Sequence, residues 1–109
     1  MANRHLSRTI AMQSLFEWDF NGRKDEIKNI ALQHIKEFSG DNEEEDFIFE
    51  LAEGVVKNLE AIDEIIVKNA PEWPIAQIPP VDRNVLRLGV YELMFLKKVP
   101  PKVVNPIVY

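Results

Sequence analysis

The chain has 109 residues, of which 46% are hydrophobic and 28% are charged, and its formal net charge at pH 7 is -5. This length and composition fit one globular domain, and the net negative charge means that any affinity for a polyanion has to come from a local cationic patch. The absence of cysteine excludes disulfides and thiol chemistry and fits a cytoplasmic protein, and no apolar run reaches the roughly 20 residues of a membrane span.

The first predicted helix spans residues 4–20, ends at the stop signal Asn21-Gly22, and opens with basic side chains. Arg4 and Arg8 are four residues apart and share a face, with His5 beside them. Cations are unfavourable at a helix N-terminus, which favours a compensating gain such as a phosphate contact. A solvated surface without a ligand fits the same pattern.

The aromatic residues at the end of this helix, Phe16, Trp18 and Phe20, are predicted to be core or partly buried. Phe16 is also a candidate anchor for a partner protein, because aromatic side chains are enriched at the centres of interfaces. A second helix is expected from about residue 25 to residue 38, where apolar residues recur every three or four positions.

A third helix is predicted as one continuous element over residues 41–69, beginning with a capping box of Asp41 and Glu44. Gly54 within its apolar face predicts a close helix crossing. The acids over 43–46 are explained by the helix dipole, so no metal site is expected there. The face predicted to be buried consists of Phe47, Leu51, Val55, Leu59, Ile62 and Ile66.

Residues 71–80, PEWPIAQIPP, contain four prolines and are predicted to form a linker with Trp73 as its anchor in the core. The fourth helix is expected to begin near Pro80 or Val81 and to run to about Lys98. It is apolar over most of its circumference, so we expect other parts of the protein to pack against it on most sides. The apolar residues concerned are Val85, Leu86, Leu88, Val90, Leu93 and Leu96.

Arg83, Arg87 and Tyr91 occupy successive turns of this fourth helix, with Asp82 next to the first of them. Arginine binds phosphate well and a tyrosine ring can stack on a base, so these residues are candidates for RNA contact. The same pattern also fits an Arg87 that pairs with an acid of another helix and a Tyr91 that lies half in the core. The residues alone favour this second interpretation.

Enzymatic activity is not expected. No nucleophile has a base nearby in the sequence, no glycine-rich phosphate loop is present, and the two histidines fall in separate helices. Catalytic residues, a cofactor and a bound metal are therefore all predicted to be absent.

A set of spaced residues in this chain resembles the NusB transcription antitermination factors over residues 4–104. Its last part is the segment DRNVLRLGVYEL at 82–93, followed by VPPKVV. The earlier parts are R-x-x-x-R-x-x-A-x-Q-x-L-F at 4–16, L-x-x-G-V at 51–55, I-D-x-x-I at 62–66, and Trp73.

This resemblance implies an all-α protein, a NusB-like helical bundle, in a single domain over 1–109. It would have an N-terminal three-helix part over 1–70, the linker over 71–80, and the start of a C-terminal helical part over 81–109. The partners implied are boxA-type RNA of ribosomal RNA leader transcripts, the small-subunit ribosomal protein NusE and the RNA polymerase antitermination complex, while a homodimer is left open.

The resemblance also implies which residues bind these partners. For RNA they are Arg4, His5, Arg8, Arg83 and Arg87. For the partner protein they are Phe16, Asp82 and Tyr91.

The chain departs from the family pattern after Val104, where it continues as NPIVY and Pro106 disfavours the next family helix. This departure predicts a C-terminally truncated or frameshifted member. Two other functions are left open: an RNA-binding accessory domain of a ribosomal RNA 5-methylcytosine methyltransferase, and an RNA-independent helical interaction module.

Overall fold

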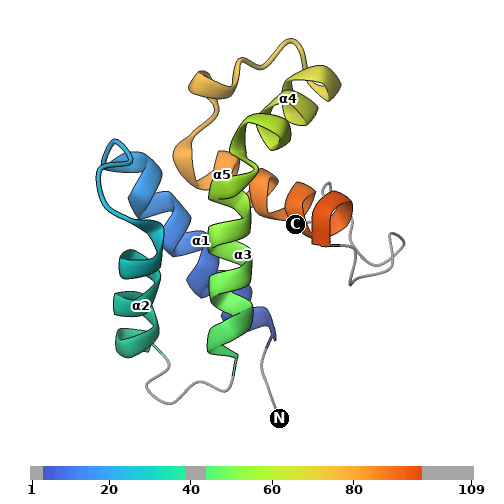
Figure 1. Cartoon of the computed structure of the whole chain (residues 1–109). Coiled ribbons are helices and arrows are strands. Elements are labelled where there is room, and N and C mark those ends of the chain that lie inside the picture. Colours follow the sequence, from blue (N-terminus) through green and yellow to red (C-terminus); the bar gives the residue numbers. More distant parts are fainter. Residues whose placement is uncertain (1–3, 39–43, 97–109) are drawn as a thin grey trace.

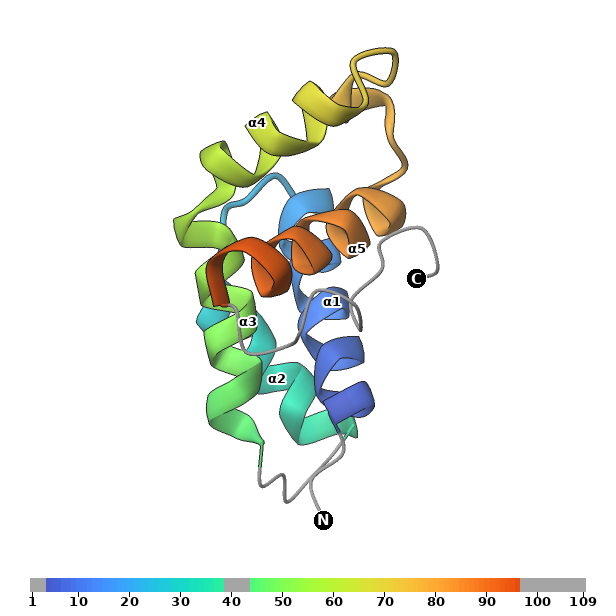
Figure 2. The ribbon, with the colours of Figure 1, turned by 90° about the vertical axis from the view of Figure 1, so that its right-hand side faces the viewer.

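The computed structural model describes residues 4–38 and 44–96, and within these ranges every regular element is helical. The elements are α1 (Arg4–Phe20), α2 (Ile27–Phe38), α3 (Glu45–Lys57), α4 (Leu59–Asn69), η1 (Ile75–Gln77), α5 (Pro80–Val90) and η2 (Tyr91–Leu96). Helices α1, α2 and α3 pack against one another, as Figure 1 shows, and Figure 2 shows α5 lying across α1 and α3 with α4 along it. The predicted all-α fold is confirmed.

One hydrophobic core joins these helices. The face of α1 that carries Ile10, Ala11 and Leu15 lies at most 1% exposed between the other helices. The remaining buried members of the core are Trp18, Ile27, Ile30, Ala31, Ile35, Phe47, Ile48, Leu51, Ala52, Val55, Ile62, Ile66, Leu88 and Tyr91. None of the described helices is long and apolar enough to cross a lipid bilayer.

Helix α1 has the predicted bounds and ends at Phe20, two residues before Gly22, whose φ of +82° is the left-handed conformation that glycine adopts most easily. Of the three aromatics near this end, Trp18 is buried as predicted, and Phe16 is half-buried. The prediction for Phe20 was wrong, since this ring is 67% exposed. Phe20 lies two positions after Trp18, which places it on the opposite side of the helix.

The predicted third helix is two helices, α3 and α4, which meet at Asn58. Both the backbone N–H and the side-chain amide of Asn58 donate to the Gly54 carbonyl, at 3.0 and 2.8 Å. Asparagine amides compete with the backbone in this way, and the helix ends there. At the start of α3, Glu44 is the capping residue and makes no side-chain cap hydrogen bond. The predicted cap Asp41 lies outside the described residues.

Trp73 does not anchor the linker in the core, because its side chain is 64% exposed. The buried residue of the segment is Ile78, which is 6% exposed and follows the 3₁₀ turn η1. The linker is also held by Arg83, whose Nη1 donates to the carbonyl oxygens of Ile75 and Ile78 at 3.3 Å. The linker is therefore held by the buried Ile78 side chain and by the hydrogen bonds from Arg83, and not by the Trp73 indole.

Helix α5 begins at Pro80, as predicted, and passes directly into the π-helical turn η2. Its apolar surface is only partly covered by described residues: Leu88 is buried, while Val81, Met94 and Phe95 are 44%, 49% and 38% exposed. Lys98, the predicted end of this helix, and the chain after it, including Val104, lie outside the described residues.

Candidate nucleic-acid interface

The basic first turns of α1 form an exposed cationic group at one end of the helix bundle. Arg4 and Arg8 lie on one face, and their guanidinium carbons are 3.8 and 5.8 Å from the centre of the Phe47 ring on α3. Cation–π attraction makes this ring a shared support for both side chains. Arg4 is 49% exposed, Arg8 is 31% exposed, and His5 is also on the surface. The three residues thus lie near the start of α1 with exposed or partly exposed side chains, and their contact with RNA stays a prediction.

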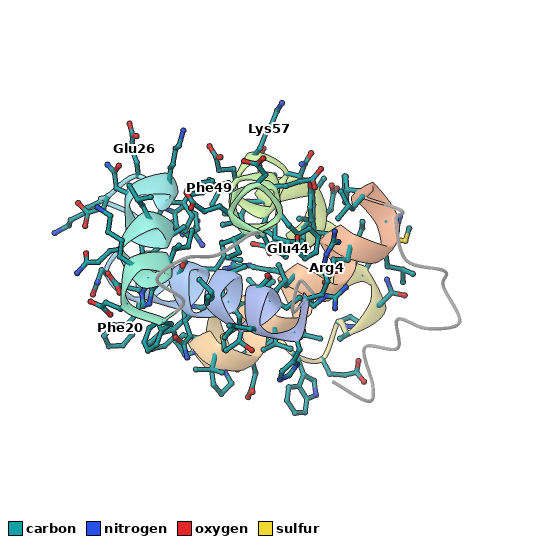
Figure 3. The ribbon with its side chains drawn as sticks, turned by 90° about the horizontal axis from the view of Figure 1, so that it is seen from below. Arg4, Phe20, Glu26, Glu44, Phe49 and Lys57 are labelled. Atoms are coloured by element: carbon teal, nitrogen blue, oxygen red, sulfur yellow. The ribbon has the colours of Figure 1, made fainter. Side chains whose placement is uncertain are left out.

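Each arginine also has an acidic partner that the sequence analysis did not identify. Arg4 Nε is 3.3 Å from Glu44 Oε1, and Figure 3 shows these two side chains meeting between α1 and α3. Arg8 Nε donates to both carboxylate oxygens of Glu92, at 3.0 and 2.9 Å, and Glu92 is only 1% exposed. Both arginines are thus paired with an acid, and the Arg4 pair is the more exposed of the two.

A groove of about 240 Å³ lies beside the Arg8–Glu92 pair, between α1 and α5. Its polar lining comes from His5, Arg8, Thr9 and Glu92, and its apolar lining comes from Met12, Val85 and Leu88. The groove is thus continuous with the cationic surface.

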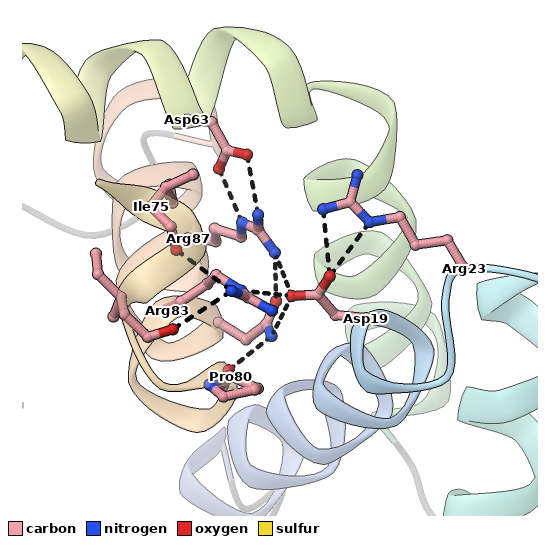
Figure 4. Close-up of polar contacts among 9 residues, drawn as sticks. Asp19, Arg23, Asp63, Ile75, Pro80, Arg83 and Arg87 are labelled. Atoms are coloured by element: carbon pink, nitrogen blue, oxygen red, sulfur yellow. Dashed lines mark hydrogen bonds and ion pairs between the residues drawn. The ribbon is translucent and has the colours of Figure 1, made fainter. Parts of the chain in front are cut away.

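Arg87 does not belong to this surface. Its side chain is 1% exposed and forms a bidentate pair with Asp63 on α4, from Nε to Oδ1 at 2.8 Å and from Nη2 to Oδ2 at 2.9 Å. Its Nη1 donates to Asp19 Oδ2 at 2.8 Å and to Asn84 Oδ1 at 3.1 Å (Figure 4). The guanidinium is enclosed by protein acceptors, and this favours the ion-pair interpretation of Arg87 over a contact with RNA.

Arg83 lies in the same ionic cluster, which we define as Asp19, Arg23, Asp63, Arg83, Asn84 and Arg87. Arg83 Nε donates to Asp19 Oδ2 at 2.7 Å, and its side chain is 15% exposed. On the other side of the carboxylate, Arg23 Nη2 is 3.2 Å from Oδ1 and is 44% exposed. Arg83 therefore holds the linker and α5 to the end of α1, and this structural role is an alternative to the predicted contact with RNA.

Asp19 is the centre of the ionic cluster, and its side chain is 4% exposed. Burial by itself would raise the pKa of this carboxyl group. The hydrogen bonds from Arg83 and Asn84 and the charges of Arg87 and Arg83 outweigh burial and lower the pKa below the ordinary value of 3.8. The carboxylate is therefore ionised throughout the neutral range.

This lowered pKa predicts an acid-dependent loss of stability. The unfolded chain takes up the Asp19 proton at a higher pH than the folded chain, so its contribution is present above about pH 4 and is lost as the pH falls through the folded pKa. We expect the difference in melting temperature between wild type and Asp19→Asn to be constant from pH 7 to pH 5 and to shrink below pH ~4. Thermal melts followed by circular dichroism would measure it. A difference that stays constant down to pH ~3 would contradict the assignment.

Tyr91 is 8% exposed and its ring lies directly over Gly54 of α3, where a Cβ atom would overlap the ring. This contact confirms the predicted close helix crossing at Gly54. Burial, and then the charge of Glu50, raises the pKa of Tyr91 above its ordinary value of 10.0, so its hydroxyl is neutral. A ring enclosed in this way is a core residue, which corrects its prediction as a partner contact.

Phe16 and Asp82, the other predicted partner-binding residues, lie away from Arg4, toward the other end of α1. The Phe16 ring stacks on Phe20 with 5.5 Å between centroids, and Asp82 is exposed in the first turn of α5. A groove of about 400 Å³ is lined there by Met12, Gln13, Phe16, Glu17, Phe20, His34 and Val81. Phe16 is therefore part of an apolar surface that joins the end of α1 to the start of α5.

Among the described residues, no group of three or more histidine, cysteine, aspartate or glutamate side chains is placed to hold a metal ion. The functional candidates that sequence reasoning missed are Phe47, Glu44 and Glu92. Of these, Glu92 had a usable signal, since it is a single acid inside the otherwise apolar run LGVYELMFL.

Comparisons with known proteins agree with this architecture. A family model described as the NusB family matches residues 5–106. Transcription antitermination protein NusB from Desulfitobacterium hafniense is 37% identical over 101 residues, covering 93% of this chain and 68% of the relative. The same protein from Clostridium novyi is 38% identical over 104 residues, covering 93% and 76%.

Solved structures show the same relationship. The T. maritima NusB structure superposes with a TM-score of 0.84 at 30% identity, covering 95% of this chain and 72% of that one. A complex of the antitermination factors NusB and NusE with double-stranded RNA matches with a TM-score of 0.78 at 32% identity, covering 90% of this chain and 71% of that one.

Proposed function

The chain belongs to the NusB family of RNA-binding, non-enzymatic antitermination factors, and from this premise we propose that it binds boxA-type RNA of ribosomal RNA leader transcripts together with NusE. It would do so in the cytoplasm, as part of the RNA polymerase antitermination complex. The relatives matched above are antitermination proteins, which favours this role over that of a methyltransferase accessory domain. A homodimer stays a prediction.

The observation that carries the RNA-binding part of the proposal is the surface of Arg4, His5 and Arg8. Arg4 and Arg8 supply local positive charge on a chain whose net charge is -5, and phosphate attraction depends on such local groups. Because the Phe47 ring supports both guanidinium groups, they are ordered before RNA arrives. Arg83 and Arg87 are not part of the proposed RNA surface, since the ionic cluster occupies them.

For NusE, we assign the apolar surface that contains Phe16 and Phe20 at the end of α1 and Val81 at the start of α5. Exposed aromatic residues grouped around a groove are typical of protein interfaces. Phe20 and Val81 are 67% and 44% exposed, and the exposed Asp82 adds an acid at the edge that suits a basic partner. RNA and NusE would then occupy different parts of α1 and could bind at the same time.

Replacing Arg4 by alanine is expected to weaken binding of boxA-type RNA by about fivefold and to reduce the salt dependence by about 0.7 in the slope of log K against log salt. Arg4 is half exposed, so its loss should change stability by less than about 1 kcal/mol. The measurement is fluorescence anisotropy of a labelled RNA at two salt concentrations, with and without NusE.

The matched control is Lys24→Ala, which removes one exposed positive charge just beyond the other end of α1. It should weaken binding by less than about twofold. Equal losses from the two variants would indicate a non-specific effect of net charge. Undetectable binding by the folded wild-type chain, even with NusE present, would overturn the proposed function.

A further inference from the structure

Glu92 is almost fully buried beneath the proposed RNA surface, and both of its carboxylate oxygens accept from Arg8 Nε. We propose that Glu92 is a positioning residue, which orients the Arg8 guanidinium so that its outer edge meets the RNA backbone. This inference rests on the proposed function and concerns how one of its contacts is prepared.

The geometry of the pair leaves Arg8 capable of a second contact. The bonds to Glu92, at 3.0 and 2.9 Å, use the single N–H of Nε, while the two terminal nitrogens carry the other four N–H groups of a guanidinium. The Arg8 side chain is 31% exposed although its partner is 1% exposed, so the pair runs from the interior to the surface. A carboxylate at the inner edge therefore fixes the plane of the guanidinium without occupying the terminal nitrogens.

The position of Glu92 in the π-helical turn η2 makes this orientation possible. Its neighbour Tyr91 packs on Gly54 of α3, and Glu92 faces α1. Two consecutive residues are thus both buried, against two different helices. π-helical turns are frequent at functional sites. The turn carries the carboxylate to Arg8 and is itself held by the tyrosine ring.

The two ways in which Glu92 could act on RNA binding, through its charge and through the orientation of Arg8, predict opposite changes in affinity, so the proposal can be tested. A negative charge near the RNA surface repels phosphate, so a Glu92 that acts only through its charge would weaken RNA binding. If Glu92 instead orients Arg8, less entropy is lost when the Arg8 side chain is ordered on RNA, and Glu92 strengthens RNA binding. The sign of the change in affinity on neutralising Glu92 separates the two effects.

The decisive variant is Glu92→Gln, measured by anisotropy with the boxA-type RNA. We expect about fivefold weaker binding, although the variant removes one negative charge. The control Glu53→Gln makes the same charge change at an exposed acid of α3 that forms no ion pair with another described residue, and it should bind equally well or more tightly. Unchanged or tighter binding by Glu92→Gln would overturn the positioning role.

A double-mutant cycle with Arg8→Ala separates orientation from a general effect on folding. In the Arg8→Ala background, Glu92→Gln should no longer weaken RNA binding, because no guanidinium remains to be oriented. The same fivefold loss in both backgrounds would show that Glu92 acts through the fold and would overturn the proposal. Thermal melts establish that each variant is folded at the temperature of the titration.

A measurement without RNA distinguishes this inference from the proposed function. The Arg8 Nε–H signal in a proton–nitrogen NMR spectrum should exchange slowly with water in the wild type and quickly in Glu92→Gln. An unchanged exchange rate would overturn the positioning role while leaving RNA binding intact. A wild-type chain that binds no RNA would instead overturn the proposed function, and with it the role of Arg8.

Discussion

Arg87→Ala is expected to lower the free energy of unfolding by about 3–5 kcal/mol, the largest effect of any single change in the ionic cluster. Arg87 is 1% exposed, and it neutralises Asp19, which is 4% exposed, and Asp63, which is 22% exposed. Removing the guanidinium leaves Asp63 without an ion-pair partner among the described residues and takes from Asp19 the most buried of its three arginines. Since domains of this size are stable by about 5–15 kcal/mol, the variant should be close to unfolding.

Urea denaturation followed by circular dichroism measures this loss, and Arg23→Ala is its matched control. Arg23 contacts the same Asp19 carboxylate at 3.2 Å, but its side chain is 44% exposed, so its removal should cost less than about 1 kcal/mol. If Arg87→Ala and Arg23→Ala lowered the free energy of unfolding by similar amounts, burial would not be what determines how much each arginine contributes to stability.

A second comparison separates the buried charge from the lost side-chain volume. Arg87→Met keeps most of the apolar volume and should still be strongly destabilising in an otherwise wild-type chain. Adding Asp63→Asn should recover part of the lost stability, because Arg87 is the only ion-pair partner that Asp63 has among the described residues. A double variant less stable than Arg87→Met alone would show that the charge on Asp63 is not what Arg87 has to balance.

The order and bounds of the helices could be predicted because they depend on local signals. Gly22 lies just after the end of α1 and Pro80 begins α5, and both residues act on the backbone next to them. The break at Asn58 was missed because the apolar period continues through it. There the side-chain amide shares the Gly54 carbonyl with the backbone N–H of Asn58, an interaction that has no periodic signature in the sequence.

The candidate site could be predicted only in part, because partners far apart in sequence decide what a charged side chain does. Arg4 and Arg87 look alike as cations on helices, yet one is half exposed and the other is enclosed by Asp19 and Asp63. The residue pattern had already favoured an ion pair for Arg87 but could not name the acids. In the same way, the balance of charge at Arg8 depends on Glu92, which is 84 positions away.

The effect of Gly54→Ala on the free energy of unfolding is expected to change sign with the residue at position 91. Alanine at an interior helical position is favoured over glycine by about 1 kcal/mol, but here its Cβ would overlap the Tyr91 ring. The ring is 8% exposed and stacks on Phe95 with 6.1 Å between centroids, so it cannot easily move aside. Overpacking of this kind costs about 1–3 kcal/mol, and the net expectation in the wild type is a loss of up to about 2 kcal/mol.

In a Tyr91→Leu background the ring is gone, and Gly54→Ala should stabilise the chain by up to about 1 kcal/mol, because only the helix preference remains. Urea denaturation of the four chains in this cycle gives the coupling, which we expect to equal the overpacking cost of about 1–3 kcal/mol. Equal effects of Gly54→Ala in both backgrounds would mean that the ring does not require glycine. The close contact matters beyond stability, because it holds η2 against α3 while the next residue, Glu92, reaches Arg8. A loss of the contact should therefore also weaken RNA binding, through the orientation of Arg8.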